Sequence, residues 1–191
     1  MEKQDVIEFF DRLAPAWDAD LVRNEAVIRC ILDFAGVRPG AEVLDVACGT
    51  GVLLPDYLKR QANVTAIDIS PEMARVAAEK FPQARVLCGD AETEVFDRKF
   101  DCIVVYNAFP HFPEPERLVR TLAGHLNPGG ILTVAHGMSR VQLEKHHSGS
   151  ARRVSVPLVH EDELAAIFSS CLTVTAKISD AQMYLVAGKK E

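Results

Sequence analysis

The sequence predicts an α/β fold in three layers, with a mostly parallel sheet of about seven strands and helices on both faces. Two observations predict it. Between residues 42 and 136, short apolar runs that suit buried strands alternate with segments of helical periodicity. This alternation is typical of a parallel sheet. After residue 160 a helical segment and two short strands follow one another, which predicts an antiparallel hairpin in the same sheet.

Two helices are expected ahead of the first strand. Apolar residues recur at helical spacing in residues 3–14 and again in 22–35. Gly36 ends the second helix, and Pro39-Gly40 turns the chain toward the sheet. We expect residues 1–36 to form a helical N-terminal segment.

The expected core is residues 37–137, and it has the strand-helix order of a Rossmann-like fold. Its expected strands are residues 42–47, 64–69, 84–88, 101–106 and 131–136. Its expected helices are residues 51–61, 71–80, 92–96 and 114–125.

Two further parts are expected after the core. Residues 138–160 are expected to form an insert, and residues 161–191 a helix from Glu161 to Ser169 and the hairpin. The hairpin strands run from Leu172 to Ser179 and from Gln182 to Ala187. No linker is long enough to split the 191 residues, so a single domain, 1–191, is predicted.

The most informative segment is the end of the first strand, which reads Asp-Val-Ala-Cys-Gly-Thr-Gly over residues 45–51. Glycines let a backbone turn sharply and approach a ligand closely. A dinucleotide site would place a small residue where Leu54 stands. A carboxylate at Asp45 suits a cofactor with a cationic amino group better than one with a pyrophosphate. S-adenosylmethionine is such a cofactor.

Two more acids follow at strand ends. Asp68 ends the second strand, 17 residues after Gly51, and an acid there can accept two ribose hydroxyls. Asp90 stands in a Gly-Asp-Ala string after the third strand. In open α/β sheets ligands bind at the carboxyl ends of the strands. Any one of these acids could simply cap a turn or helix, but their joint spacing favours one common site.

These motifs resemble those of class I S-adenosylmethionine-dependent methyltransferases of the small-molecule type. A Pro-Gly-Gly turn at residues 128–130 adds a further match, and the resemblance spans roughly residues 37–137. It implies that residues 37–137 are the cofactor-binding core, that residues 1–36 form a helical lid over it and that residues 138–160 form an insert on the acceptor side. It also implies that Asp90 lies against the adenine, with the next backbone amide on a ring nitrogen. The cofactor-binding residues expected on this basis are Asp45, Ala47, Cys48, Gly49, Thr50, Gly51, Asp68, Ile69, Met73, Asp90, Ala91 and Asn107.

The segment after the fourth strand should border the transferred methyl group, with Tyr106 facing the acceptor. His111 falls where family members often have a histidine, and His136 ends the fifth strand at the same edge. Both are candidate bases near neutral pH; the alternative for His111 is that it only caps or packs the loop. Trp17 either covers the sulfonium side of the pocket or anchors a helix on the core.

The insert is basic in an otherwise acidic protein, and Arg152 and Arg153 lie in it. One hypothesis is that it steers an anionic acceptor toward the cofactor; the alternative is a solvated loop. All six histidines follow residue 110, but His146 and His147 are adjacent, and the sequence after His160 lacks a second histidine at helical spacing. No metal site is therefore expected.

Composition excludes several function classes. The net charge of −6 disfavours a nucleic-acid surface. Residues 107–110 read Asn-Ala-Phe-Pro, not the tetrapeptide of nucleic-acid amino-methyltransferases. No apolar run is long enough to span a membrane, and no secretory signal is visible. The five cysteines are odd in number and widely spaced along the chain, which favours reduced, buried thiols and a cytoplasmic location.

The sequence thus predicts an enzyme that moves a methyl group from S-adenosylmethionine to a small molecule at oxygen, nitrogen, sulfur or carbon. Two alternatives remain open. One is a cofactor-binding regulatory subunit without chemistry of its own. The other is a nicotinamide-dependent oxidoreductase, which Leu54 disfavours. The acceptor and the oligomeric state are not readable from the sequence.

Overall fold

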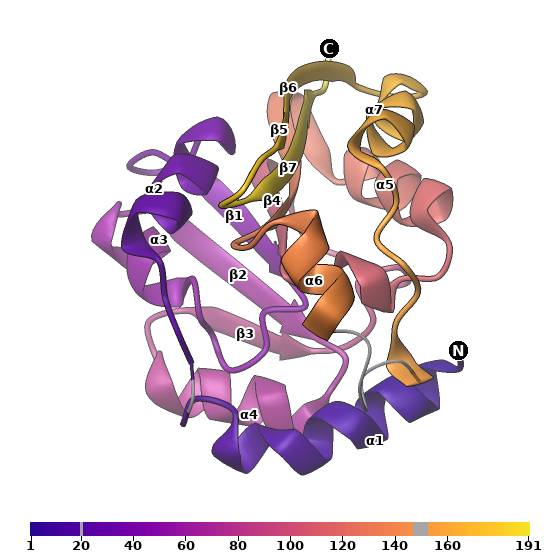
Figure 1. The fold of residues 1–191 in the computed structure, drawn as a ribbon. Helices are drawn as coiled ribbons and strands as arrows, with labels where there is room; N and C mark the ends of the chain where they lie inside the picture. The colour runs from indigo at the N-terminus through magenta and orange to yellow at the C-terminus, as the bar shows by residue number, and fades with distance from the viewer. Residues whose placement is uncertain (20, 147–152) are drawn as a thin grey trace.

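The computed structural model describes residues 1–19, 21–146 and 153–191, and it has the predicted three-layer α/β architecture (Figure 1). In this part of the chain seven strands form one sheet in the order β3-β2-β1-β4-β5-β7-β6. The strands are β1 (Glu42–Val46), β2 (Asn63–Asp68), β3 (Arg85–Cys88), β4 (Phe100–Tyr106), β5 (Leu126–His136), β6 (Thr173–Ser179) and β7 (Tyr184–Lys189).

The first five strands are parallel, and β7 inserts antiparallel between β5 and β6. The predicted C-terminal hairpin is therefore confirmed. From β1 the chain adds β2 and β3 on one side of the sheet, and it then returns to place β4 on the other side of β1. Such a reversal leaves a crevice at the carboxyl ends of the two central strands, where ligands bind in this class of fold.

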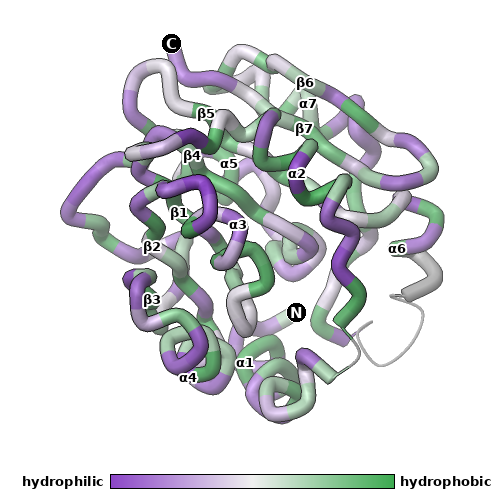
Figure 2. Tube along the Cα trace, turned by 90° about the vertical axis from the view of Figure 1, so that its left-hand side faces the viewer, coloured by the Kyte–Doolittle hydropathy of each residue, from purple (hydrophilic) through white to green (hydrophobic). Residues whose placement is uncertain are grey.

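Helices cover both faces of the sheet. They are α1 (Lys3–Leu13), α2 (Glu25–Phe34), α3 (Leu54–Lys59), α4 (Pro71–Lys80), α5 (Pro115–Gly124), α6 (Arg140–His146) and α7 (Glu161–Ser169), with short 3₁₀ turns η1 (Ala14–Ala16) and η2 (Phe109–His111). Side chains alternate along each strand. On β1, Val43 packs with residues of α2 and α3, whereas Leu44 packs with residues of α5 and α7. Figure 2 shows the apolar colour concentrated on the strands.

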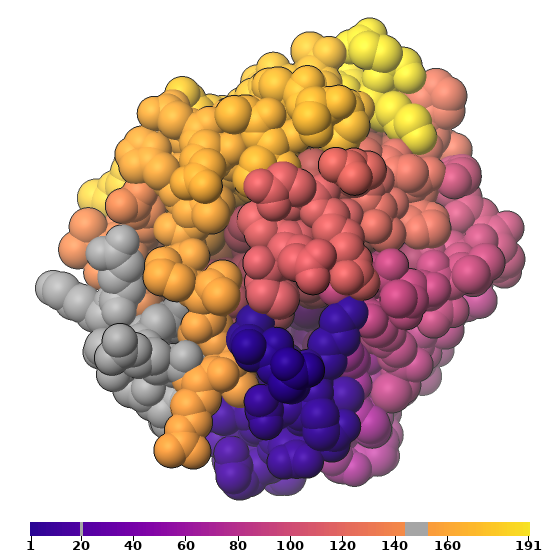
Figure 3. Space-filling model, turned by 90° about the vertical axis from the view of Figure 1, so that its right-hand side faces the viewer, coloured from indigo at the N-terminus to yellow at the C-terminus, as the bar shows by residue number. Residues whose placement is uncertain are grey.

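The N-terminal segment lies across the carboxyl edge of the sheet and packs against α4. The Asp11 carboxylate of α1 accepts hydrogen bonds from the Ser70 hydroxyl at 2.5 Å and from the Glu72 amide at 3.1 Å. It therefore caps the N-terminal turn of α4, where free backbone amides favour an acid. Figure 3 shows the first residues, in indigo, next to the segment coloured for α5.

Four predicted local features differ in the structure. The strand predicted over 131–136 begins at Leu126 as β5, and residues 128–130 lie within it, next to a shift in its register with β4, and not in a turn before it. The helix predicted over 51–61 begins only at Leu54, because residues 50–53 form turns. The helix predicted near 92–96 is absent; the Asp90 carbonyl accepts from the Thr93 and Glu94 amides in a tight turn instead. The insert contains α6, which no sequence pattern indicated.

The expectation that the cysteines are buried thiols is only partly right. All five are free, but Cys88 and Cys171 are exposed, Cys30 is half-buried, and Cys48 and Cys102 alone are buried. Cys88 is exposed because β3 is an edge strand with little cover, and Cys171 because it lies in the turn after α7. Within the described residues, no helix is both long and apolar enough to cross a membrane.

Candidate functional site

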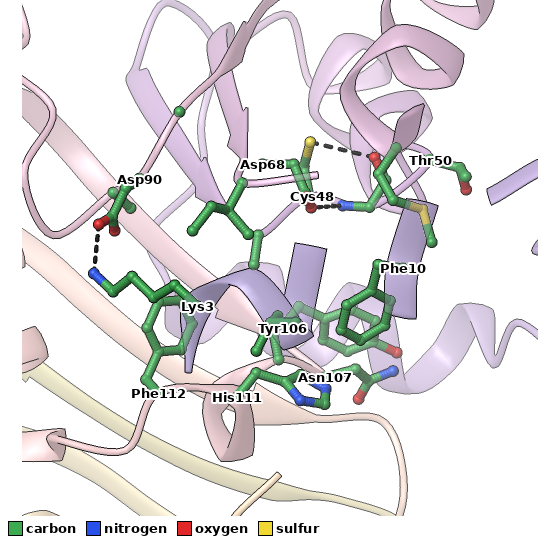
Figure 4. A pocket seen from close by; sticks show the side chains of 18 of the residues that line it. Lys3, Phe10, Cys48, Thr50, Asp68, Asp90, Tyr106, Asn107, His111 and Phe112 are labelled. Carbon is green, nitrogen blue, oxygen red and sulfur yellow. Dashed lines mark hydrogen bonds and ion pairs between the residues drawn. The ribbon is translucent and has the colours of Figure 1, made fainter. Parts of the chain in front are cut away.

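A cavity opens at the carboxyl ends of the central strands, beneath the N-terminal segment (Figure 4). It brings together residues that are far apart in the sequence, as the strand-end argument predicts. The predicted site residues that line it are Trp17, Ala47, Cys48, Gly49, Thr50, Asp68, Ile69, Met73, Asp90, Ala91, Tyr106, Asn107 and His111.

The turn after β1 forms one wall of the cavity. Ala47 and Gly49 have φ values of 54° and 55°, in the left-handed region. That conformation costs a residue with a Cβ about 1–2 kcal/mol. Backbone strain of this kind is typical of residues at ligand-binding sites, and Ala47 lies on the cavity wall. A Cβ on Gly49 would meet no described protein atom within 4 Å, whereas one on Gly51 would meet Leu54 and Phe81 below 3.0 Å. Gly49 thus faces open space, and Gly51 allows close helix packing.

Asp68 lies at the end of β2, next to this turn. Its two carboxylate oxygens accept hydrogen bonds from the Gly49 amide at 2.7 Å and from the Ser70 amide at 2.9 Å. Burial raises the pKa of Asp68 to about 6, the two amides oppose that rise, and Asp11 adds repulsion. The amides hold the carboxylate in a fixed orientation, and each oxygen keeps a second lone pair for a ligand hydroxyl.

Asp90 lies across the cavity, in the turn after β3. Its Oδ1 accepts from the Glu92 amide at 3.0 Å, and its Oδ2 is paired with the Lys3 ammonium of α1. Lys3 also pairs with Glu92 at 2.8 Å, and the Glu92 side chain is only 4% exposed. This acidic pair thus ties the first turn of α1 to the rim of the cavity (Figure 4).

Asp45 is not on the cavity wall, although it was predicted to bind the cofactor. It lies behind the turn, fully enclosed, and neither its Oδ2 nor the neighbouring Tyr57 hydroxyl makes a hydrogen bond of ordinary geometry within the described residues. Burial, and secondly the charge of Asp68, raise the pKa of Asp45 to about 8, while Tyr57 opposes the rise. An orphaned buried acid at this point would be stabilised by a nearby cation.

The loop after β4 forms the opposite wall. Asn107 has φ 54°, and its side-chain oxygen accepts from the Gly137 amide at 2.9 Å, which joins the ends of β4 and β5. His111 closes η2, and its Nδ1 lies 2.6 Å from the Val154 carbonyl oxygen. Because a carbonyl can only accept, Nδ1 carries the proton, and Nε2 of the neutral ring holds the lone pair.

The N-terminal segment adds residues that sequence reasoning missed. Phe10 stacks edge-on against His111 at 4.9 Å and against Trp17 at 5.6 Å between ring centroids. Lys3, Val6 and Phe10 all line the cavity. Helical periodicity showed that this helix has an apolar face, but nothing in the sequence showed what that face covers.

The remaining predicted residues lie elsewhere. His136 is buried in the core, edge-on to Tyr184 at 5.9 Å, and not on the cavity wall. His136 stands two residues after Val134 on β5, so both side chains point to the face of the sheet that α5 and α7 cover. Arg153 is exposed and does not line the cavity, and Arg152 lies outside the described residues. Within the described ranges, no group of three or more potential ligand side chains could hold a metal ion.

Comparison with known proteins decides the family. A methyltransferase-domain profile matches residues 43–130. This stretch contains Asp68, Asp90 and the turn of residues 47–51 after β1, called the glycine turn below. This stretch is a methyltransferase domain, and together with the relatives and solved structures below it supports a class I S-adenosylmethionine-dependent methyltransferase. Solved structures agree on the fold. A SAM-dependent methyltransferase from Aquifex aeolicus has a TM-score of 0.72 at 20% identity, covering 100% of both chains. The N-methyltransferase NodS from Bradyrhizobium japonicum has a TM-score of 0.75 at 15% identity, covering 96% of this chain and 97% of that one.

Two curated methyltransferases are similar in sequence. The demethylmenaquinone methyltransferase of Renibacterium salmoninarum is 31% identical over 140 residues, 69% of this chain and 58% of that protein. The ubiquinone biosynthesis O-methyltransferase of Xanthomonas campestris pv. campestris is 35% identical over 127 residues, 61% of this chain and 53% of that protein. The chain thus spans little more than half the length of these methyltransferases.

Proposed function

We propose that this methyltransferase transfers a methyl group from S-adenosylmethionine to a small aromatic acceptor. The observation that carries the proposal is the cavity itself. One end is built from the glycine turn, Asp68 and Asp90, and the other end has an aromatic wall. Both ends open into the same space, so two ligands can meet there.

The residues at the first end fit the cofactor. The open space over Gly49 admits a ligand close to the backbone. Asp68 would hold the two ribose hydroxyls, and Asp90 with the Ala91 amide would hold the adenine. The orphaned Asp45 would stabilise the cationic amino group from behind the turn. When bound, the sulfonium makes the attached methyl carbon electrophilic.

The second end suits a planar, largely apolar acceptor. Its wall contains Phe10, the Trp17 and His111 rings that stack against Phe10, and Tyr106. Such side chains bury large flat surfaces and leave little polar surface for a sugar or a nucleotide. The two curated relatives are quinone-pathway enzymes by name, which supports an aromatic or quinonoid acceptor.

The protein's own part in the reaction is alignment, exclusion of water and proton removal. The N-terminal segment lines the cavity and would exclude water from the bound ligands, and the walls would hold the reactants in line. His111 is the proposed general base. Its Nδ1–H is held by Val154, so Nε2 would take the proton from a hydroxyl or amine acceptor.

Methyl transfer from radiolabelled S-adenosylmethionine, by the purified protein alone and against a panel of phenols, catechols and quinols, tests the proposal. We expect labelled product with at least one aromatic acceptor. His111→Gln should lower kcat about 10²-fold or more, whereas His125→Gln, away from the cavity, should not. Cofactor binding with no transfer to any acceptor would favour a regulatory subunit instead.

A further inference from the structure

Asp18 joins the N-terminal segment to the glycine turn. Its Oδ1 accepts from the Thr50 hydroxyl at 2.6 Å, and its Oδ2 accepts from the Lys80 ammonium, also at 2.6 Å. Lys80 donates as well to the Thr50 carbonyl oxygen at 2.9 Å. These three residues, called the Asp18 cluster below, come from the N-terminal segment, the turn after β1 and the last position of α4.

Thr50 brings the Asp18 cluster to the cofactor end of the cavity. It lines the cavity, only 1% of its surface is exposed, and it directly follows Gly49. The end of α4 supports the turn a second time, since a Cβ on Gly51 would meet the Phe81 ring at 2.9 Å. Because the space over Gly49 is open, a ligand seated there would restrain the turn and, with it, the Asp18 cluster.

The residue before Asp18 belongs to the acceptor end of the cavity. Trp17 lines the cavity, yet 39% of its surface is exposed, so packing alone holds it loosely. Its ring lies edge-on to Phe10 at 5.6 Å, and Phe10 lies edge-on to His111 at 4.9 Å. The bonds of the Asp18 carboxylate tie down the backbone from which Trp17 projects. Contacts thus run without a break from the glycine turn to the aromatic wall.

We infer that Asp18 is a positioning residue, which orders Trp17 in the aromatic wall when a cofactor occupies the glycine turn. The inference rests on the proposed function and names the link between the two ends of its cavity. A first ligand that orders Trp17 lowers the entropic cost of binding the second. The acceptor should therefore bind more tightly after the cofactor, and linkage makes this coupling reciprocal.

Trp17 is the only tryptophan in the sequence, so its fluorescence reports on this position without a label. Acrylamide quenching of Trp17, measured with and without saturating S-adenosylhomocysteine, tests the inference. In the wild type the ligand should lower the quenching constant, which means that it protects the ring. In Asp18→Ala that protection should be lost. Calorimetry should still show S-adenosylhomocysteine binding within about tenfold of the wild type, because only one bond to a charged group is removed from the turn.

Lys80→Met is the second variant, because it breaks the Asp18 cluster from α4 and leaves the N-terminal segment unaltered. It should lose most of the protection as well. Lys80→Arg keeps a cation that can donate to both oxygens, and it should retain the protection. Glu79→Met is the matched control, since Glu79 precedes Lys80 but pairs with Arg75 on α4, and it should behave as the wild type.

The inference is wrong if S-adenosylhomocysteine binds the wild type without protecting Trp17. It is also wrong if Asp18→Ala keeps the full protection, since the ligand would then shield the ring itself. Complete loss of S-adenosylhomocysteine binding in Asp18→Ala would equally overturn it and make Asp18 part of the cofactor site or of the fold. Failure of the proposed function looks different: the wild type would methylate no aromatic acceptor, and protection of Trp17 would still be measurable.

Discussion

Asp68 is the side chain on which the proposed cofactor site depends most. Two backbone amides hold its carboxylate at 2.7 Å and 2.9 Å, and it is 93% enclosed by protein, with 7% of its surface exposed. A fixed carboxylate can accept two neighbouring hydroxyls without losing side-chain freedom on binding. A mobile surface acid could not offer the same geometry.

Asp68→Asn should therefore weaken S-adenosylhomocysteine binding by about 10–100-fold, because bonds to a charged acceptor contribute about 1.5–3 kcal/mol. Isothermal titration calorimetry measures this, and circular dichroism checks that the variant is folded. Asp97→Asn is the matched control, since Asp97 pairs with Arg85 and Arg98 on the surface. Wild-type affinity in Asp68→Asn would place the ribose elsewhere.

The raised pKa of Asp45 leads us to predict an unusual dependence of stability on pH. Its pKa is raised in the folded protein to about 8 from an ordinary value of 3.8. The folded state then binds more protons than the unfolded state between these values, so the free energy of unfolding should fall as pH rises from about 4 to 8, at most by about 1.4 kcal/mol per pH unit. Below about pH 4 both states are protonated, and the slope should vanish.

Asp45→Asn removes that titration. Urea denaturation of both proteins from pH 4 to pH 8, without ligand, should show a flatter profile for the variant and a relative gain in its stability at the alkaline end. Asp68, whose pKa is about 6, contributes to the slope only up to that pH and stays in both proteins. Parallel profiles for wild type and variant above pH 6 would mean that Asp45 is ionised in the native protein.

At this scale the sequence predicted which acids stand at strand ends, and the structure places Asp68 and Asp90 on one cavity. It did not predict that Asp45 lies behind the wall. Strand alternation puts Asp45 on the same face as Val43, toward α3 and Tyr57.

The N-terminal segment, residues 1–19, is the part whose contacts sequence patterns could not indicate, although they predicted the bounds of its helix α1 to within one residue. It is held to the core by polar contacts at three points: Lys3 with Asp90 and Glu92, Asp11 with the start of α4, and Asp18 with Thr50 and Lys80. Each contact joins residues more than thirty positions apart in sequence. Helical periodicity carries no information about such partners.

Lys3→Met should loosen this segment. The ion pairs of Lys3 are partly exposed, so their loss is worth about 0.2–1 kcal/mol, and the cofactor should dissociate up to about fivefold faster. Stopped-flow displacement of a fluorescent cofactor analogue measures the rate, which should also become less sensitive to salt. Arg75→Met removes comparable pairs on the outside of α4 and should leave it unchanged. Slower dissociation from Lys3→Met would show that Lys3 competes with the adenine for Asp90.

Elements with strong periodicity were predicted well, and those set by local turns were not. The helix Glu161–Ser169 has the predicted bounds, and β4 begins one residue early. The start of α3 was misplaced because the glycine turn continues to residue 53 before a helix can form. The turn after Asp90 is stabilised by its own carbonyl and carboxylate, and such local bonds compete with helix formation at a residue of this type.

On the scale of the whole molecule, ligand binding and folding should be coupled. The proposed cofactor contacts β1, β2, β3 and the N-terminal segment at once, so it binds the native state and not the unfolded chain. S-adenosylhomocysteine at 100 times its Kd should add about 2.7 kcal/mol to the free energy of unfolding. For a chain of this size that raises Tm by about 5–10 °C.

Differential scanning fluorimetry measures this shift, and NAD at the same concentration is the comparison ligand. The nicotinamide cofactor should produce no shift, because Leu54 is fully buried where a dinucleotide site would need a small residue. A larger shift with NAD than with S-adenosylhomocysteine would revive the oxidoreductase alternative. The division into a lid, a core, an insert and a terminal hairpin stays a prediction, as does the cytoplasmic location.

A crystal structure of the protein with S-adenosylhomocysteine tests the central claim most directly. We predict the ribose hydroxyls on Asp68, the adenine beside Asp90 and Ala91, and the amino-acid part over residues 47–50. Density for the ligand outside this cavity, or a ribose that makes no contact with Asp68, would contradict the account.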